Sequence, residues 1–327
     1  MKQDEIPVLI LGFNRPNLIL ELLNSLSRVQ PKKIYFAVDG PRFDNQADRE
    51  LVAKVQNALS VINWKCEIRS LFRENNLGLK KAVIEAIDWV FENEDVAIIL
   101  EDDCLPIDDF FPFCAEALEK YRFDSRVMQI SGNCFVPLSD LNCDRYYFST
   151  LNDIWGWATW KRAWELFERG VPEHDTSELK KKLNGYFPKR EISRWFTRYV
   201  VEATASDSQV WSTLWTLTLV KNQGYSLVPQ TNLVRNVGFS GDATHMTDEA
   251  FHIYDKFKPR PILSRTYPME ILANRELDIQ RFSIIKATDL NLRRSSLFIN
   301  KLRRASLSIL PTGVVSLVRA FKRKYLV

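Results

Sequence analysis

The first 135 residues alternate short apolar runs with longer helical patterns, and this alternation constrains the fold more than any other feature of the sequence. The apolar runs are rich in β-branched residues, which is typical of buried strands. They lie at Ile6–Leu11, Lys33–Val38, Glu67–Leu71, Val96–Leu100 and Val127–Ser131, and the helical patterns between them lie at Leu18–Leu26, Asp48–Val61, Leu79–Phe91 and Phe110–Tyr121. Strands separated by helices of this length predict right-handed βαβ units in a doubly wound α/β sheet.

Polar side chains follow three of these predicted strands, at the point where each strand ends. The first strand leads into Phe13-Asn14-Arg15, the second into Asp39-Gly40, and the fourth into Glu101-Asp102-Asp103. In open α/β sheets, ligands bind at the carboxyl ends of the strands. The pattern alone therefore predicts that these three strand ends share one crevice.

After about residue 140 the chain changes character. Tryptophans are frequent between Trp155 and Trp164, a mostly helical region follows, and one more strand is expected at Ser226–Pro229. Asn232–His245 is predicted to be an ordered loop. These changes suggest an α/β half at 1–135, a second half of the same domain at 136–285, and a tail at 286–327.

Composition favours an ordinary globular protein, with 46% hydrophobic and 26% charged residues. The N-terminal residues have no signal-peptide pattern, and no apolar run is long enough to span a membrane. The five cysteines form no CxxC pair, so we expect reduced thiols in the cytoplasm and no zinc site.

Charge is distributed unevenly along the chain. The 286–327 tail holds ten Lys and Arg residues against one acidic residue, a net charge of +9, which leaves −5 on the rest of the chain out of a total of +4. The body is mildly acidic and the tail is basic, so the partners of each are inferred separately.

The acidic triplet Glu101-Asp102-Asp103 is the strongest chemical signal in the sequence. Three adjacent acids at the end of a buried strand raise one another's pKa unless a positive charge lies beside them. Mn²⁺ or Mg²⁺ prefers such oxygen ligands, together with the phosphates of a substrate. The alternative is a solvated acidic loop, or acids at the N-terminus of the helix predicted from Phe110.

The order of these motifs resembles that of GT-A glycosyltransferases, particularly the broad family 2. The resemblance rests on Asn14-Arg15-Pro16, Val38-Asp39-Gly40, Asn75-Asn76-Leu77-Gly78 and Leu100-Glu101-Asp102-Asp103. The acidic triplet is similar to the Asp-x-Asp motif of N-acetylglucosaminyltransferase I. Two later stretches, Ser206–Trp211 and Asn232–His245, resemble bacterial members from surface-polysaccharide pathways. The resemblance covers roughly residues 6–245 and implies a GT-A fold with a Rossmann-like, mostly parallel sheet. It also implies that 1–135 form the nucleotide-sugar-binding half and that 136–285 form the acceptor-binding half.

The resemblance also implies a donor site. Asp39 would bind the nucleobase, most often uracil, Asp102 would approach the ribose or donor sugar, and Asp103 would ligate the metal. His245 would contact the metal or the phosphates. The other implied donor-site residues are Phe13, Asn14, Arg15, Glu101 and Lys80, with Asn14 and Arg15 at the base and ribose end. Lys80 or the neighbouring Lys81 would approach the nucleotide, and a solvated helix face is the alternative for at least one of them.

Sugar transfer also needs a base that takes the proton of the acceptor hydroxyl. In the family an acidic residue at the place of Asp207 is this base, which implies inversion at the anomeric carbon. Asp207 also precedes a predicted amphipathic helix, so a simple N-cap is the alternative. Asp153 is the reserve candidate for the base.

The segment Trp155-Gly156-Trp157-Ala158-Thr159-Trp160 has two interpretations. Aromatic residues at this spacing are usually core residues, but in sugar enzymes they also form flat surfaces on which sugar rings stack. We expect at least one of Trp155 and Trp157 to contact the acceptor or donor sugar. Trp160 and Trp164, four residues apart, are predicted to lie on one helix and to face the core.

The Gln-x-x-Arg-Trp motif of processive synthases is absent, which favours the addition of single sugars. The predicted function is an inverting, metal-dependent transfer from a nucleotide-diphosphate sugar, with UDP expected, to a glycan or lipid-linked acceptor in surface-polysaccharide biosynthesis. Two alternatives are a sugar-phosphate nucleotidyltransferase and a non-catalytic nucleotide- or carbohydrate-binding protein. The single glycine in Gly12–Pro16 argues against the first, and the intact acidic triplet argues against the second.

The basic tail mixes Lys and Arg with apolar residues at helical spacing. Such a pattern suits an anionic membrane surface. A solvated terminal helix and a docking segment for a partner are the alternatives, and nucleic-acid binding is not expected because the body is acidic. We therefore expect a cytoplasmic protein that resides peripherally on the inner face of the membrane.

Overall fold

The computed structural model describes residues 1–136, 146–170, 176–204, 208–238 and 256–288. The strands are β1 (Val8–Gly12), β2 (Lys33–Val38), β3 (Glu67–Phe72), β4 (Val96–Glu101), β5 (Cys104–Pro106), β6 (Val127–Ser131), β7 (Tyr147–Ser149), β8 (Trp157–Trp160), β9 (Tyr225–Val228) and β10 (Val234–Asn236). The helices are α1 (Pro16–Leu26), α2 (Gln46–Asn57), α3 (Leu79–Phe91), α4 (Phe110–Lys120), α5 (Lys161–Trp164), α6 (Thr176–Tyr186), α7 (Arg190–Thr204) and α8 (Ser212–Lys221), with short 3-10 turns at Gln3–Glu5 and Ala58–Val61. Residues 275–288 form a further helix.

One mixed sheet runs through the molecule in the order β3-β2-β1-β4-β8-β6-β9-β7. Strands β1 to β4 are mutually parallel, and β8 lies antiparallel between β4 and β6. Because β8 opposes both neighbours, β6 points the same way as β4, and β9 is parallel to β6. The prediction of an α/β, mostly parallel sheet of the GT-A type is confirmed.

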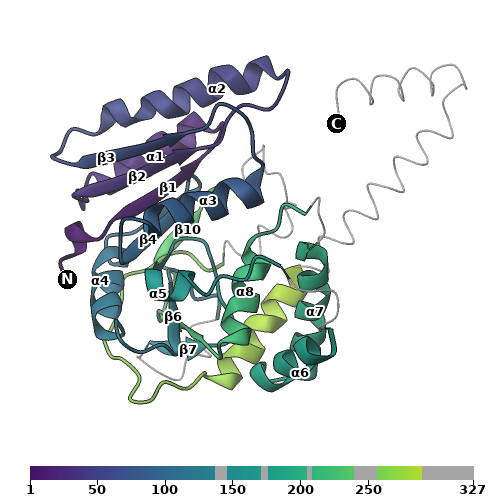
Figure 1. Ribbon diagram of the computed structural model, residues 1–327. Coiled ribbons are helices and arrows are strands. Elements are labelled where there is room, and N and C mark those ends of the chain that lie inside the picture. The colour runs from purple at the N-terminus through teal and green to yellow at the C-terminus, as the bar shows by residue number, and fades with distance from the viewer. Residues whose placement is uncertain (137–145, 171–175, 205–207, 239–255, 289–327) are drawn as a thin grey trace, which may run out of the picture.

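Helices cover both faces of the sheet (Figure 1). Along β1, Val8 and Ile10 belong to the core cluster that contains residues of α1, α2 and α4, whereas Leu9 and Leu11 belong to the cluster on the other face, which contains residues of α3 and of α5 to α8. A strand buried on both faces needs apolar residues at every position, which is why the sequence shows continuous apolar runs rather than alternation.

The predicted elements of the first half are confirmed in type and order, and three details of the prediction are wrong. The expected helix Asp48–Val61 begins at Gln46, behind an Asn45 side chain that accepts from the Asp48 N–H, and its last turn is 3-10. Trp160 ends strand β8 instead of lying in a helix with Trp164, although both are buried. The predicted loop after Asn232 contains β10, which pairs antiparallel with β5.

Strands from both sides of residue 135 join the same sheet, and the proposed division at that position stays a prediction. Within the described residues, no helix has the length and apolar character needed to cross a bilayer. The four cysteines that the structure describes, Cys66, Cys104, Cys114 and Cys134, are free thiols. The basic tail from residue 289 onward lies outside the described residues.

Candidate donor and catalytic site

The carboxyl ends of β2, β1 and β4 lie next to one another, as the sequence predicted. The backbone N–H of Asp39 donates to the Gly12 carbonyl at 3.1 Å, and the N–H of Asp102 donates to the Leu11 carbonyl at 3.0 Å. The polar residues that follow these strands are therefore held at one edge of the sheet.

Arg15 joins the two aspartates of the acidic triplet. Its guanidinium donates to both carboxylate oxygens of Asp102, from Nε at 3.0 Å and from a terminal nitrogen, and to Asp103 Oδ2 at 3.0 Å. Asp102 is 2% exposed, so this is a largely buried, partly two-pronged ion pair. The sequence placed Arg15 at the base and ribose end of the site, whereas the structure also makes it the counter-ion of the acids.

The single positive charge of Arg15 does not offset the negative charge of three ionised carboxyl groups. Burial and the charges of Asp103 and Asp102 raise the pKa of Glu101 to about 8. Burial also raises the pKa of Asp102 to about 7, against the lowering effect of Arg15. Among the described residues, no side chain or backbone group forms a hydrogen bond with the Glu101 carboxylate. The site therefore has excess negative charge that favours a bound cation.

The end of β10 and the two residues after it contact Asp103 of the acidic triplet. Asn236 Nδ2 donates to Asp103 Oδ1 at 3.2 Å, and the N–H of Val237 donates to the Asp103 carbonyl at 2.8 Å. A Cβ on Gly238 would overlap Asp103 Oδ2. The structure thus brings together two motifs that are more than 130 residues apart in the chain.

Asp39 fixes the turn that precedes α3. Its carboxylate accepts four hydrogen bonds: from the N–H groups of Gly40 (2.9 Å), Leu77 (3.0 Å) and Gly78 (3.2 Å), and from Asn76 Nδ2 (2.9 Å). Burial nevertheless raises the pKa of Asp39 above its usual value. A nucleobase that binds Asp39 would therefore share an acceptor already used by this turn.

A second acidic residue, missed in the sequence, organises the β1 end. Asp48 at the start of α2 is 2% exposed and accepts from Asn14 Nδ2 at 2.8 Å and from Arg42 Nε at 2.5 Å. The Arg42 guanidinium lies 5.7 Å from the centre of the Phe13 ring. Asn14 and Phe13, both predicted donor-site residues, are thus linked to Arg42. No local pattern marked Asp48, because its burial depends on these contacts with Asn14 and Arg42.

Lys80 does not lie free on a solvated helix face. Its ammonium donates to the carbonyl of Ala203, near the end of α7, at 2.7 Å. Gln209 lies against Gly78, where a Cβ would be 2.6 Å from Gln209 Oε1. Ala203 and Gln209, which precede and follow Asp207 in the chain, therefore both contact the N-terminal turn of α3. Asp207 itself and the predicted ligand His245 lie outside the described residues.

The two candidate sugar-contacting tryptophans have different environments. Trp157 is 1% exposed and packs among Trp164, Trp211 and Trp215, so its rings are not accessible to a sugar. The prediction for Trp157 is corrected to a core role. Trp155 is only partly buried and packs edge-to-face against Phe135 at 5.4 Å, so the sugar-contacting role stays a prediction for Trp155 alone.

The reserve base, Asp153, is engaged by another residue. Its carboxylate accepts from Arg281, on the helix at 275–288, at 2.5 Å, and its backbone carbonyl accepts from Gln129 Nε2 at 2.7 Å. The Arg281 contact occupies the Asp153 carboxylate, and the role of Asp153 as the reserve base stays a prediction.

Part of the sequence matches a protein-family model. Residues 8–162 match the model of glycosyl transferase family 2. The matched residues make up just under half of the chain and contain β1 to β6, the acidic triplet and Trp155. This match supports a glycosyltransferase of the family 2, GT-A type. No curated protein matches the sequence significantly.

Several solved structures resemble the fold distantly. One is the mannosyltransferase PcManGT from Pyrobaculum calidifontis, in complex with GDP-Man and Mn²⁺, at 16% identity over 67% of this chain and 69% of that one, with a TM-score of 0.37. Another is the 4-diphosphocytidyl-2C-methyl-D-erythritol synthase from Anaerococcus prevotii, at 10% identity over 69% of this chain and 88% of that one, with a TM-score of 0.34.

Proposed function

We propose that the chain is an inverting, metal-dependent glycosyltransferase that uses a nucleotide-diphosphate sugar, with UDP as the nucleotide. The observation that carries this proposal is the meeting of Arg15, Asp102 and Asp103 at the strand ends within the family 2 match. Asp39, Asn14 and Phe13 border the same edge and supply the nucleoside end of the site.

The side chains at the triplet suit a hard divalent cation. They offer carboxylate oxygens with an uncompensated negative charge, which is the ligand chemistry of Mn²⁺ and Mg²⁺. Among the described residues, no group of three or more His, Cys, Asp or Glu side chains is arranged to hold a metal ion. We therefore assign the metal to Asp103, with further ligands from the donor diphosphate and from His245.

The proposed chemistry divides between the triplet and the acceptor side. A bound divalent ion would offset the charge that develops on the departing nucleoside diphosphate. Arg15 holds Asp102 and Asp103 in place for this role. Asp207 takes the proton of the acceptor hydroxyl. The hydroxyl oxygen attacks the anomeric carbon on the face opposite the departing nucleoside diphosphate, which inverts the configuration of that carbon.

Calorimetric titration with UDP, GDP and CMP, first with Mn²⁺ and then with EDTA, tests the donor assignment. We expect UDP to bind in the presence of Mn²⁺ and to be released by EDTA. Release of free UDP from UDP-sugars then tests turnover. Nucleotide binding without turnover would favour the non-catalytic alternative, and absence of metal-dependent binding of all three nucleotides would overturn the proposal.

The raised pKa values predict a pH dependence of donor binding. A carboxyl group whose pKa is raised is protonated and neutral below that pKa, and a cation favours its ionised form. Because the pKa of Asp102 is about 7 and that of Glu101 about 8, UDP affinity in Mn²⁺ should rise between pH 6 and pH 8. Glu101→Gln should remove the upper part of this rise. An affinity that stays flat over this range in the wild-type protein would contradict the assignment.

We further propose a glycan or lipid-linked acceptor in surface-polysaccharide synthesis, reached from the inner face of the membrane through the basic tail. Ten Lys and Arg residues at 286–327 would each contribute about 1 kcal/mol close to an anionic surface. The full chain should co-sediment with phosphatidylglycerol-rich vesicles, and binding should fall as salt is raised. A chain that ends at residue 288 should remain in the supernatant. Equal behaviour of the two chains would contradict a membrane role for the tail.

A further inference from the structure

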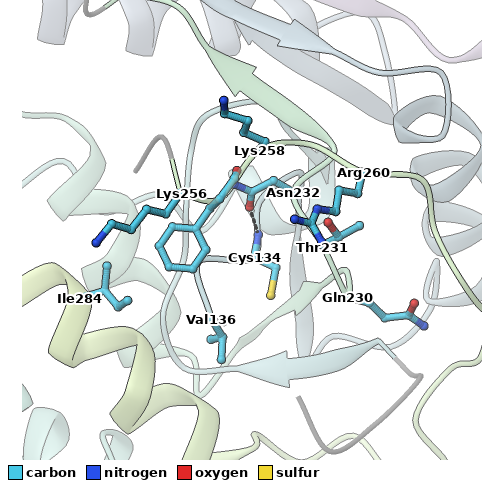
Figure 2. A pocket seen from close by; sticks show the side chains of 10 residues that line it. Cys134, Val136, Gln230, Thr231, Asn232, Lys256, Lys258, Arg260 and Ile284 are labelled. Carbon is cyan, nitrogen blue, oxygen red and sulfur yellow. Dashed lines mark hydrogen bonds between the residues drawn. The ribbon is translucent and has the colours of Figure 1, made fainter. Parts of the chain in front are cut away.

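A cavity of about 480 Å³ lies beside the carboxyl ends of β6 and β9, outside the donor site (Figure 2). Its walls come from three parts of the chain: Cys134 and Val136 after β6, Gln230 to Asn232 after β9, and the segment from Lys256 to Arg260. Ile284, on the helix at 275–288, closes one side. The cavity is large enough for one sugar-sized ligand.

The charge of this cavity has one sign. Lys256, Lys258 and Arg260 line it at alternate positions of the 256–260 segment, and no Asp or Glu is among its described lining residues. The three cationic side chains are exposed to solvent. Lysine and arginine in a concave surface attract anions and bind phosphate or carboxylate oxygens by charge-assisted hydrogen bonds.

Two buried amides hold this segment in place. Asn232, which is 4% exposed, accepts from the Cys134 N–H at 2.6 Å and donates to the Phe257 carbonyl at 2.5 Å. The Arg260 N–H donates back to the Asn232 carbonyl at 3.1 Å. Gln230 donates to the Ser264 carbonyl at 2.6 Å. The basic residues are therefore carried on a backbone that the core positions, rather than on an unsupported loop.

The cavity lies on the same edge of the sheet as the donor site. Strand β6 has the same direction as β4, and only β8 separates them, so the two strand ends are roughly 10 Å apart at ordinary strand spacing. The segment after β9 passes through β10 directly to Asn236, which contacts Asp103. A ligand in the cavity would therefore lie near the acidic triplet, at the same edge of the sheet.

Aromatic rings connect the cavity to the predicted sugar-contacting residue. Trp155 packs edge-to-face against Phe135 at 5.4 Å, and Phe135 packs against Phe257, a cavity residue, at 5.8 Å. Phe135 is 3% exposed and links the two partly buried rings, Trp155 and Phe257, through the core. Partly buried rings of this kind can offer apolar surface to the faces of sugars.

We propose that this cavity binds an anionic group, a phosphate or a carboxylate, on a sugar of the acceptor. The acceptor would then be an acidic or phosphorylated glycan held by Lys256, Lys258 and Arg260, with its reacting hydroxyl directed toward the triplet. The role as acceptor site rests on the proposed function, whereas the binding of an anionic sugar does not.

The probes are glucose 6-phosphate, glucuronate and glucose, titrated in EDTA and followed by ligand-observed NMR. We expect both anionic sugars to bind at least about tenfold more tightly than glucose. Lys256→Gln/Arg260→Gln should weaken their binding about tenfold, the loss of about 1.4 kcal/mol. The matched control is Arg49→Gln/Lys54→Gln, which removes the same charge from exposed positions of α2 and should leave binding unchanged.

A second titration separates the two sites. With UDP and Mn²⁺ at saturation, the anionic sugars should still bind, and both double variants should keep the wild-type affinity for UDP. The cavity proposal would be overturned if glucose bound as tightly as the anionic sugars, or if UDP displaced the anionic sugars. It would also be overturned if the control variant lost as much affinity for the anionic sugars as Lys256→Gln/Arg260→Gln. Absence of UDP binding would instead overturn the proposed function, and the acceptor role with it.

Discussion

Asp103→Asn should lower the affinity for UDP in the presence of Mn²⁺ by about 100-fold or more, and turnover with it. Loss of an outer-shell partner of a metal ligand already costs about 10–100-fold, so loss of the ligand's charge should cost at least as much. Asparagine has the shape of aspartate and can still accept from Asn236, so the fold should be kept. Calorimetry measures the affinity, and thermal unfolding checks the fold.

The matched control for this variant is Asp108→Asn. Asp108 is five residues away and exposed, and its contact is a surface ion pair with Arg28 at 2.6 Å. Surface pairs of this kind contribute little. Asp108→Asn should therefore behave like the wild-type protein in UDP binding. Tight, Mn²⁺-dependent UDP binding by Asp103→Asn would remove Asp103 from the metal site.

Gly40→Ala should destabilise the protein by about 3 kcal/mol and weaken donor binding. A Cβ on Gly40 would lie 2.6 Å from both the N and the O of Asn75, and these are backbone atoms that cannot rotate away. Relief of this overlap would displace the Asn75–Gly78 turn from the Asp39 carboxylate, and overpacking typically costs 1–3 kcal/mol or slightly more. Chemical denaturation measures the free energy of unfolding, and calorimetry measures UDP binding.

Gly185→Ala provides the control. It makes the same change in helix α6, where nothing lies within 4 Å of the new Cβ. Alanine in a helix should stabilise the protein by roughly 0.5–1 kcal/mol there. Wild-type stability and UDP affinity in Gly40→Ala would show that the turn is not rigidly held against β2.

Several features of the fold were readable from the sequence because they depend on local patterns. Helix α3 has the bounds predicted from its periodicity, Leu79–Phe91, and strands β2 and β6 have those of their apolar runs. In a strand buried on both faces or an amphipathic helix, each residue's burial follows from its position in the repeat. The meeting of the polar strand ends followed from the parallel direction of β1, β2 and β4.

Contacts between distant segments were not readable in this way. Trp157 is a core residue because it packs among three tryptophans, and Lys80 donates to the Ala203 carbonyl. These partners come mostly from distant segments, and the donor-site role of Lys80 stays a prediction. Spacing along the chain reports which residues are polar or apolar, but not which remote atoms share a hydrogen bond or fill a core. Asp48 and the basic cavity were missed for the same reason.

By itself, the sequence determined the layered α/β sheet and the position of the acidic triplet at its edge, because periodicity and strand direction fix both. Only the tertiary structure decided that Arg15 is the counter-ion of Asp102 and Asp103 and that the end of β10 and the two residues after it contact Asp103. It also decided that three cations gather around one cavity. Each of these arrangements depends on side chains that meet through space after the chain has folded, and no local pattern encodes that meeting.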